Sequence, residues 1–287
     1  MKNILVTGAS GFIGTELVNN LKKSGYKVFE FNSKDGDISE YNLLEKYKDI
    51  NIDHIFHLAS KTFVPYSWEN PLEFYKTIVI GTGNILEFCR LKNISLTYVS
   101  SYLYGVPKTL PISENSDITP NNPYAHSKYL AEQMCKFYSD FYNVKVVIAR
   151  PFNIYGINQK EHFLIPHIVN QVLNNDIINV EDLKPKRDYI YLKDLINGLV
   201  KTIKVENSFS IFNFGSGEEL SVQELIDITQ KVANTNKKIV SKNNARKNEI
   251  MNVVADITKA KKELNWQPIY SFEDGIKEIL SALKNEK

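Results

Sequence analysis

The chain has 287 residues and a formal net charge of +2 at neutral pH, with 43% hydrophobic and 24% charged residues. This balance is ordinary for a soluble globular protein with ample material for a core. The length suits one large α/β domain or two closely associated ones. The small net charge excludes the strong field that would point to nucleic acid or an anionic membrane as a partner.

The cysteines indicate the compartment. Cys89 and Cys135 lie in segments predicted as helices, and neither has a CxxC partner, which favours a reduced, cytoplasmic environment. The first six residues hold too short an apolar run for a signal peptide, and no segment approaches the roughly 18 apolar residues of a membrane span. We therefore expect a soluble cytoplasmic enzyme without a membrane partner or a metal site.

A glycine-rich turn follows the first predicted strand. An apolar run at residues 3–7 leads directly into three glycines, and apolar residues at helical spacing follow. This order is typical of a dinucleotide-binding unit, because glycines let the backbone approach a pyrophosphate and the N–H groups at the helix start face the anion. A purely structural turn is the alternative. The predicted cofactor contacts here are Gly8, Ser10, Gly11, Phe12, Ile13 and Gly14.

The end of the second predicted strand, residues 27–32, bears on the choice of cofactor. The position where NAD-binding folds place an acidic residue falls on Asn32, and Ser33 and Lys34 follow. An amide, a hydroxyl and an ammonium suit a 2′-phosphate better than a carboxylate would, so the sequence slightly favours NADP over NAD. An ordinary polar turn that tolerates either cofactor is the alternative. Two further predicted cofactor contacts are Asp37 and Ile38.

Two buried strands are predicted on either side of a long helical region that Pro71 opens. The first spans residues 53–59 and contains His57, which we interpret as a structural residue. The second ends at Ser100 and Ser101. Because ligands bind at the carboxyl ends of strands in such sheets, these serines are candidate site residues.

The helix that Pro123 begins carries a candidate catalytic pair. Tyr124 and Lys128 lie four residues apart, so their side chains share one face. Lowering a tyrosine pKa by three units needs roughly 4 kcal/mol, which one ammonium at about 4 Å supplies in an effective dielectric near 20. Such a pair alone would indicate a solvated helix face, but the glycine turn, the helix start and Ser100 favour catalysis. The apolar stripe of the helix is predicted at Leu130, Met134, Phe137 and Phe141.

The alternation of strands and helices through about residue 155 predicts an α/β fold with a parallel, doubly wound Rossmann sheet. A strand at 144–149 ends this series. Beyond it we expect a smaller mixed α/β lobe, with helices predicted at 164–174, 221–233, 256–264 and 272–284 and a short strand at 211–214.

These segments together resemble the extended short-chain dehydrogenases/reductases (the NAD-dependent epimerase/dehydratase family), in the branch that modifies nucleotide-activated sugars. The matching motifs cover most of the chain and lie at residues 7–14, 57–59, 81–82, 100–105, 124–128, 150–156, 187–191 and 256–268. The resemblance implies a Rossmann domain at 1–155 plus roughly 188–214. It further implies a nucleotide-sugar-binding lobe at 156–187 and 215–287.

The resemblance also implies roles for individual residues. Tyr124 would be the acid–base residue, Lys128 would hold the nicotinamide ribose and lower the pKa of Tyr124, and Ser100 would bond the reacting sugar oxygen. Further implied cofactor contacts are Leu58, Ala59 and Phe152. The implied substrate contacts are Ser101, Asn153, Arg187 and Arg246, with the asparagine and the two arginines at the diphosphate.

Both arginines have alternatives. Arg187 could instead form a salt bridge with Asp188 or Asp182, and Arg246 could be a solvated loop residue. The chain also departs from the family pattern. Ile78 stands where an asparagine is usual, which removes a polar contact near the cofactor.

A second departure concerns the reaction. Ser101 and Tyr102 replace the Asp-Glu pair of sugar 4,6-dehydratases, so water elimination is not expected. The segment between Gly156 and Pro166 lacks the long insertion of UDP-galactose 4-epimerases. The turn at 182–188 is similar to that of 4-keto-6-deoxy-sugar reductases.

The sequence therefore predicts NAD(P)H-dependent reduction of the C4 ketone of a nucleotide-linked 4-keto-6-deoxy sugar. A 4-epimerase that acts through a transient 4-keto intermediate is the alternative. A non-catalytic nucleotide-sensing protein is a third possibility, disfavoured by the complete Ser–Tyr–Lys set. Excess apolar surface on helices 81–92 and 124–142 predicts a homodimer.

Overall fold

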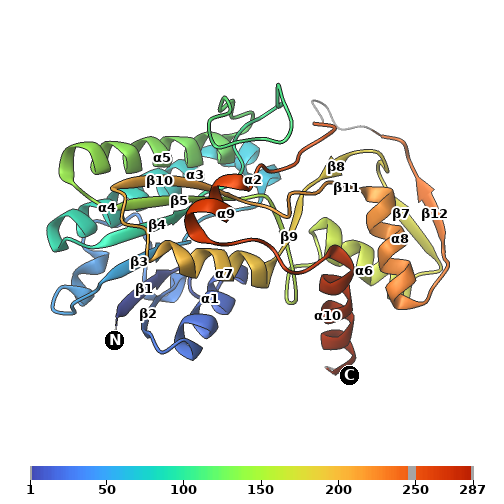
Figure 1. The fold of residues 1–287 in the computed structure, drawn as a ribbon, viewed down its shortest axis with the longest axis horizontal. Coiled ribbons are helices and arrows are strands. Elements are labelled where there is room, and N and C mark those ends of the chain that lie inside the picture. The colour runs from blue at the N-terminus through green and yellow to red at the C-terminus, as the bar shows by residue number, and fades with distance from the viewer. Residues whose placement is uncertain (1, 245–249, 286–287) are drawn as a thin grey trace.

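The computed structural model describes residues 2–244 and 250–285. Its centre is a six-stranded sheet in which every strand pairs in parallel with its neighbours (Figure 1). In spatial order the strands are β10 (Phe209–Phe214), β5 (Val146–Pro151), β4 (Ser95–Val99), β3 (His54–His57), β1 (Asn3–Thr7) and β2 (Lys27–Phe31). The inner strands are almost wholly buried, as expected for apolar runs covered on both faces. The predicted doubly wound parallel sheet is confirmed.

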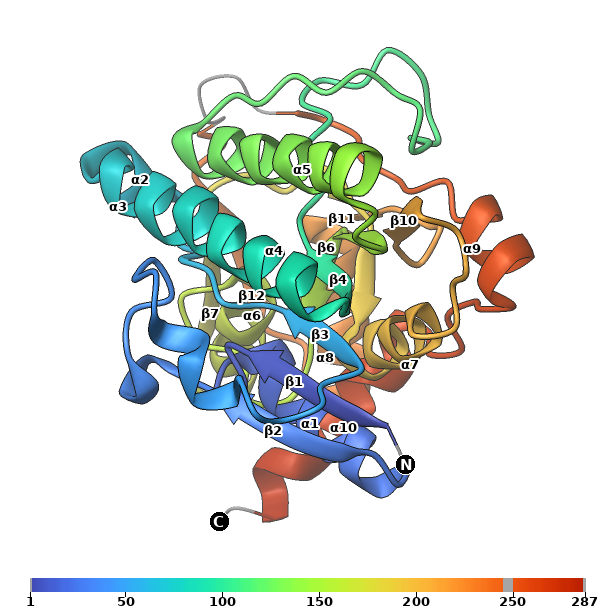
Figure 2. The same cartoon turned by 90° about the vertical axis from the view of Figure 1, so that its left-hand side faces the viewer.

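Helices cover both faces of the sheet (Figures 1 and 2). One layer consists of α1 (Phe12–Lys23), α7 (Leu192–Thr202) and α9 (Thr258–Leu264). The other consists of α2 (Val64–Glu69), α3 (Pro71–Phe74), the π-helix η3 (Tyr75–Ile80), α4 (Gly81–Lys92) and α5 (Pro123–Tyr142). Two short 3₁₀ turns follow β2, namely η1 (Ser33–Asp35) and η2 (Leu43–Tyr47). None of the helices in the described residues has the length and apolar character to cross a membrane.

The buried face of α5 is not the one that its apolar stripe predicted. Phe137 and Phe141 are 51% and 69% exposed. The side of the helix that packs on the sheet instead carries Ala125, Ser127, Lys128, Ala131, Glu132, Cys135 and Ser139. These residues are mostly small, so the helix approaches the sheet closely, and its large aromatic side chains point outward.

A second lobe, formed by segments before and after β10, lies at one end of the sheet (Figure 1). Its strands form three two-stranded pairs: β6 (Asn153–Tyr155) with β9 (Tyr189–Tyr191), β8 (Lys186–Arg187) with β11 (Leu220–Ser221), and β7 (Ile177–Val180) with β12 (Lys238–Ser241). Its helices are α6 (Leu164–Asn174), α8 (Val222–Ala233) and α10 (Phe272–Asn285). The helices predicted at 164–174, 221–233 and 272–284 therefore agree with the structure to within one residue.

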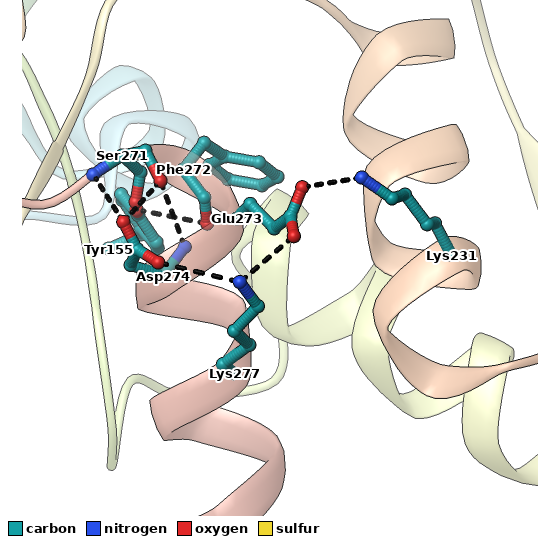
Figure 3. A network of polar contacts seen from close by, with 7 residues as sticks. All are labelled: Tyr155, Lys231, Ser271, Phe272, Glu273, Asp274 and Lys277. Carbon is teal, nitrogen blue, oxygen red and sulfur yellow. Dashed lines mark hydrogen bonds and ion pairs between the residues drawn. The ribbon is translucent and has the colours of Figure 1, made fainter.

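The C-terminal helix α10 is fixed to this lobe at its first turn (Figure 3). The Tyr155 phenol lies 3.4 Å from the carbonyl oxygen of Ser271, and its ring packs at 5.0 Å from the ring of Phe272. Lys231 of α8 pairs with Glu273 at 2.8 Å. Because exposed ion pairs contribute little, the buried aromatic contacts supply most of this attachment.

Candidate active site

The glycine turn lies between β1 and α1, packed against the end of β3. Gly8 has a φ of +68°, and a side chain there would place Cβ 2.8 Å from the backbone nitrogen of Ala59. At Gly14 a Cβ would lie 2.1 Å from the carbonyl oxygen of Gly8. Only glycine fits either position. No side chain caps the start of α1 at Gly11, so the backbone N–H groups of its first turn are available to an anion.

The polar residues predicted to contact the adenosine end follow β2. Asn32 accepts a hydrogen bond from the Ser10 backbone at 2.8 Å, which joins this segment to the glycine turn. Ser33 and Lys34 are exposed, and Lys34 forms no ion pair within residues 2–244 and 250–285. The ammonium of Lys34 is therefore available to a phosphate group.

A carboxylate that sequence reasoning missed lies beside them. Asp35 accepts a hydrogen bond from the Asn32 backbone at 2.8 Å and pairs with Lys46 at 2.7 Å. The Lys46 ammonium holds the pKa of Asp35 below its usual range. The spacing of Asn32 and Asp35, three residues apart like the two ends of a capping box, was the signal that could have revealed it.

The other two predicted contacts in this region have protein partners. Asp37 accepts hydrogen bonds from Ser39 and lies 3.1 Å from Lys76. Ile38 is buried, and its side chain packs against Gly81 at the start of α4.

The candidate catalytic residues meet where β4 ends and α5 begins. The Ser101 side chain lies close to the Tyr124 phenol. Burial raises the pKa of Tyr124 to about 12, an effect that the nearby Ser101 hydroxyl opposes. Ser100 is buried, and its hydroxyl has no hydrogen-bond partner among residues 2–244 and 250–285. A buried hydroxyl without a partner is costly, so this group indicates a place where a ligand oxygen binds.

Lys128 lies beneath this site. Its ammonium donates to the carbonyl oxygen of Val99 at 2.7 Å and lies 4.8 Å from the centre of the Tyr98 ring. Burial lowers the pKa of Lys128 to about 7, while the Glu132 carboxylate one turn further along α5 acts to raise it. An ammonium has three donors, and one is used here, so Lys128 can also donate to the hydroxyl groups of a ribose.

The expected lowering of the Tyr124 pKa by Lys128 is wrong for this arrangement. The sequence argument assumed a fully charged ammonium beside a phenol of ordinary pKa. In the structure, burial raises the pKa of Tyr124 and lowers that of Lys128, so at neutral pH the phenol keeps its proton.

An aromatic wall faces Tyr124 across the carboxyl end of the sheet. Tyr102 stacks on Phe152 with ring centres 5.2 Å apart, and Tyr104 stacks on the same ring at 6.4 Å. The Tyr102 hydroxyl donates to the amide oxygen of Asn153 at 3.3 Å. The Asn153 amide nitrogen donates to the backbone of Asp188 at 3.0 Å. The structure thus brings two predicted site residues, Phe152 and Asn153, together with Tyr102.

The predicted diphosphate ligands lie where the two lobes meet. Arg187 donates to the carbonyl oxygen of Lys186 at 2.8 Å. The Asp188 carboxylate, considered as a salt-bridge partner for Arg187, accepts backbone hydrogen bonds from Ser216 and Gly217 at 2.6 and 3.0 Å. Arg246 lies outside the described residues.

Other buried polar residues support the site from below. Both ring nitrogens of His57 lie within hydrogen-bond distance of threonine hydroxyls, and burial lowers the pKa of His57 to about 3, as expected of a structural residue. Arg150 forms a buried pair with Glu132, with its Nε 3.0 Å from the carboxylate, and donates to the Tyr104 hydroxyl at 3.0 Å. The described residues contain no cluster of side chains suited to a metal ion.

Comparison with known proteins defines the family. A family model described as GDP-mannose 4,6 dehydratase matches residues 30–279. The Methanocaldococcus jannaschii protein described as "Putative UDP-glucose 4-epimerase" is 33% identical over 305 residues that cover 98% of each chain. GDP-6-deoxy-D-mannose reductase of Pseudomonas aeruginosa is 26% identical over 294 residues, which cover 98% of this chain and 96% of the reductase.

Solved structures agree with this result. UDP-glucose 4-epimerase of Thermotoga maritima, with UDP-glucose, superposes with a TM-score of 0.93 at 26% identity and 99% coverage of both chains. RMD from Pseudomonas aeruginosa, complexed with NADPH, gives 0.91 at 27% identity and full coverage of both.

The chain therefore belongs to the NAD-dependent epimerase/dehydratase family of extended short-chain dehydrogenases/reductases, whose members act on nucleotide sugars. Within that family it is an NAD(P)-dependent enzyme of nucleotide-sugar metabolism.

We predict that Lys128→Met stabilises the protein while removing a residue needed for activity. The pKa of Lys128 is about 7 in the folded protein and near 10.5 in the unfolded chain, so between these values the unfolded state binds more protons. The free-energy cost of burying the charged ammonium is therefore largest below about pH 7, and it decreases as the pH rises. The substitution should add about 1–4 kcal/mol to the free energy of unfolding at pH 6, and less at pH 9.5.

Urea unfolding at the two pH values measures this gain. Lys136→Met, on the exposed side of the same helix, is the matched control and should show no pH-dependent gain. A loss of stability in Lys128→Met at pH 6, or a gain independent of pH, would contradict the interpretation.

Proposed function

We propose that the protein is an NADPH-dependent reductase of the C4 ketone of a nucleotide-linked 4-keto-6-deoxy sugar. The feature that carries this proposal is the position of the Tyr124 phenol beside Ser101 at the end of β4. Burial raises the pKa of this phenol, which favours its neutral form. Ketone reduction needs a proton donor at the start of the reaction, whereas oxidation of a C4 hydroxyl, the first step of epimerisation, needs a base.

The residues around the glycine turn fit a nicotinamide dinucleotide. The tight turn that Gly8 and Gly14 allow, the uncapped start of α1 and the remaining donors of Lys128 are the features such a group requires. The exposed ammonium of Lys34 supports NADPH, because Asp35, the nearby carboxylate, is already neutralised by Lys46. When bound, the nicotinamide supplies the hydride.

The side chains of this enzyme supply the remaining requirements of the reduction. Tyr124 delivers the proton from its phenol oxygen to the C4 oxygen of the sugar, and the nearby Ser101 hydroxyl can orient that phenol. Ser100, whose hydroxyl has no protein partner, donates to the same sugar oxygen. Lys128 holds the ribose and, as charge accumulates on the phenol, stabilises it.

We further propose that residues 1–155 and roughly 188–214 hold the cofactor, and that 156–187 and 215–287 hold the nucleotide sugar. Asn153 and Arg187 lie where these parts meet, and together with Arg246 they would bind the diphosphate. A reducing, cytoplasmic location agrees with the two free cysteines, both of which are buried.

A nucleotide-sugar 4-epimerase is the second candidate. The similarity to two UDP-glucose 4-epimerases favours it, at 33% sequence identity in one case and a TM-score of 0.93 in the other. It would use Ser100, Tyr124 and Lys128 to remove and return a hydride, with NAD retained between the two steps.

Nicotinamide absorbance during turnover tests the function. A panel of 4-keto-6-deoxy sugars linked to UDP, dTDP or GDP should include a substrate that consumes one NADPH per product, with NADPH preferred over NADH. Tyr124→Phe should lower kcat by about 100-fold or more, with KM little changed. Tyr129→Phe, on the same helix, is the matched control.

Two other results would contradict the reductase or the role of Tyr124. Interconversion of C4 epimers without net NADPH oxidation would establish the epimerase instead. Full turnover by Tyr124→Phe would contradict its role as proton donor.

We also propose that the protein forms a homodimer through α4 and α5. These helices lie side by side on the outer face of the sheet (Figure 2). Large apolar side chains remain exposed on them, with Phe137 and Phe141 in ring contact at 4.7 Å. Further exposed members of this surface are Leu91 and Tyr142.

Sedimentation velocity tests the assembly. The wild-type protein should sediment as a dimer at micromolar concentration, and Phe141→Asp should dissociate it, because a carboxylate would be buried without a partner. Lys145→Asp, an exposed change just beyond the helix, should leave the dimer intact. A wild-type monomer would contradict this proposal.

A further inference from the structure

We infer that Tyr102 determines the specificity of the sugar site, selecting sugars whose C5 carries a methyl group over those with a hydroxymethyl or carboxylate group. The inference rests on the proposed function, and it assigns to Tyr102 the part of the substrate that the other site residues do not contact.

The position of Tyr102 follows from its neighbours. Ser101 lies close to Tyr124, the group proposed to protonate the C4 oxygen, and Tyr102 is the next residue after the same strand end. Its hydroxyl points to Asn153, a predicted ligand of the diphosphate. Tyr102 therefore extends along the side of the sugar that connects C4 to the diphosphate-bearing C1.

A pyranose has two such sides. The side through C3 and C2 carries two hydroxyl groups that need hydrogen-bond partners, whereas the side through C5 and the ring oxygen carries none directly on the ring. The ring of Tyr102 stacked on Phe152 offers mainly carbon, and the hydroxyl proton of Tyr102 is directed to Asn153. Since unpartnered hydroxyl groups are costly to bury, the aromatic wall fits the C5 side.

The wall cannot easily move aside for a larger or more polar group. Tyr102 is fixed by its stack on Phe152, which is itself buried and stacked on Tyr104. The Tyr104 hydroxyl is held in turn by Arg150 and Asn213, at 3.0 and 2.5 Å. A methyl group packs well against such a surface. A hydroxymethyl group against the faces of these rings loses water and meets carbon instead of a hydrogen-bond partner.

A carboxylate at C6 fits the wall still less. Among residues 2–244 and 250–285, the cation that these contacts reach is Arg150, which is buried behind Tyr104 and paired with Glu132. It therefore cannot serve as a counter-ion.

Calorimetric titration of the protein with NADP⁺ present tests this inference. The titrants are UDP-glucose, UDP-6-deoxyglucose and UDP-glucuronic acid, the same hexose pair on dTDP and GDP, and each free nucleoside diphosphate. On the nucleotide that binds, the 6-deoxy sugar should bind about 10-fold more tightly than the hydroxymethyl sugar, and the wild type should disfavour the carboxylate most.

Variants of Tyr102 separate the wall from its hydroxyl group. Tyr102→Phe should keep the preference, because the stacked ring remains. Tyr102→Ser removes the aromatic wall, and Tyr102→Gln offers a hydrogen-bond partner to the C6 hydroxyl group of the sugar. In each variant the affinities for the 6-deoxy and the hydroxymethyl sugar should differ by no more than about twofold. Tyr26→Ser, at the opposite edge of the sheet, is a matched control, and thermal melting verifies that each variant is folded.

The results of these titrations distinguish a failure of the inference about Tyr102 from a failure of the proposed function. An unchanged ratio in a folded Tyr102→Ser or Tyr102→Gln variant, or a wild-type preference for the hydroxymethyl sugar, would overturn the inference and leave the reductase standing. Failure to bind any nucleoside diphosphate or nucleotide sugar would overturn the proposed function as well.

Discussion

The structure depends on one costly arrangement, the burial of the Lys128 ammonium against the end of β4. The protein gives that ammonium one carbonyl oxygen and the face of one aromatic ring. Glu132 lies one turn away to favour the charged form, but it is itself tied to Arg150. Helix α5 therefore places its polar side against the sheet. The small residues that separate these polar groups let it pack closely, and Phe137, Phe141 and Tyr142 are left on the outside.

The rest of the site is arranged around the same edge of the sheet. The glycine turn at the end of β1 leaves room for a dinucleotide, and the end of β4 supplies Ser100 and Ser101. The segment after β5 supplies Phe152 and Asn153. Parallel strands bring these ends together, so residues from distant parts of the chain converge on one edge of the sheet. The aromatic wall of Tyr102, Phe152 and Tyr104 bounds that edge on the side away from Tyr124.

Much of this could be predicted from the sequence. The parallel sheet, the helix at 164–174 and the glycine turn followed from periodicity and from glycine chemistry, which are local properties of the chain. The apolar stripe predicted on α5 is not the side that packs on the sheet. Periodicity reveals which side of a helix is apolar, not which side is buried. Phe137 and Phe141 occupy the apolar side and remain exposed.

Electrostatics could not be predicted in the same way. The spacing of Tyr124 and Lys128 placed both on one face correctly, but their pKa values depend on burial, which the spacing does not contain. Asp35 and Tyr102 were missed as site residues because their importance comes from contacts with Lys46 and Phe152, which lie far from them in the chain.

Proton uptake on cofactor binding tests the central claim most directly. If ribose hydroxyl groups complete the donors of Lys128, the charged form is favoured, its pKa rises from about 7, and the protein takes up a proton from the buffer. Titration calorimetry with NADP⁺ at pH 8, in buffers of different ionisation enthalpy, should show this uptake in the wild type and none in Lys128→Met. A binding enthalpy independent of the buffer in the wild type, or equal uptake in Lys128→Met, would contradict the account.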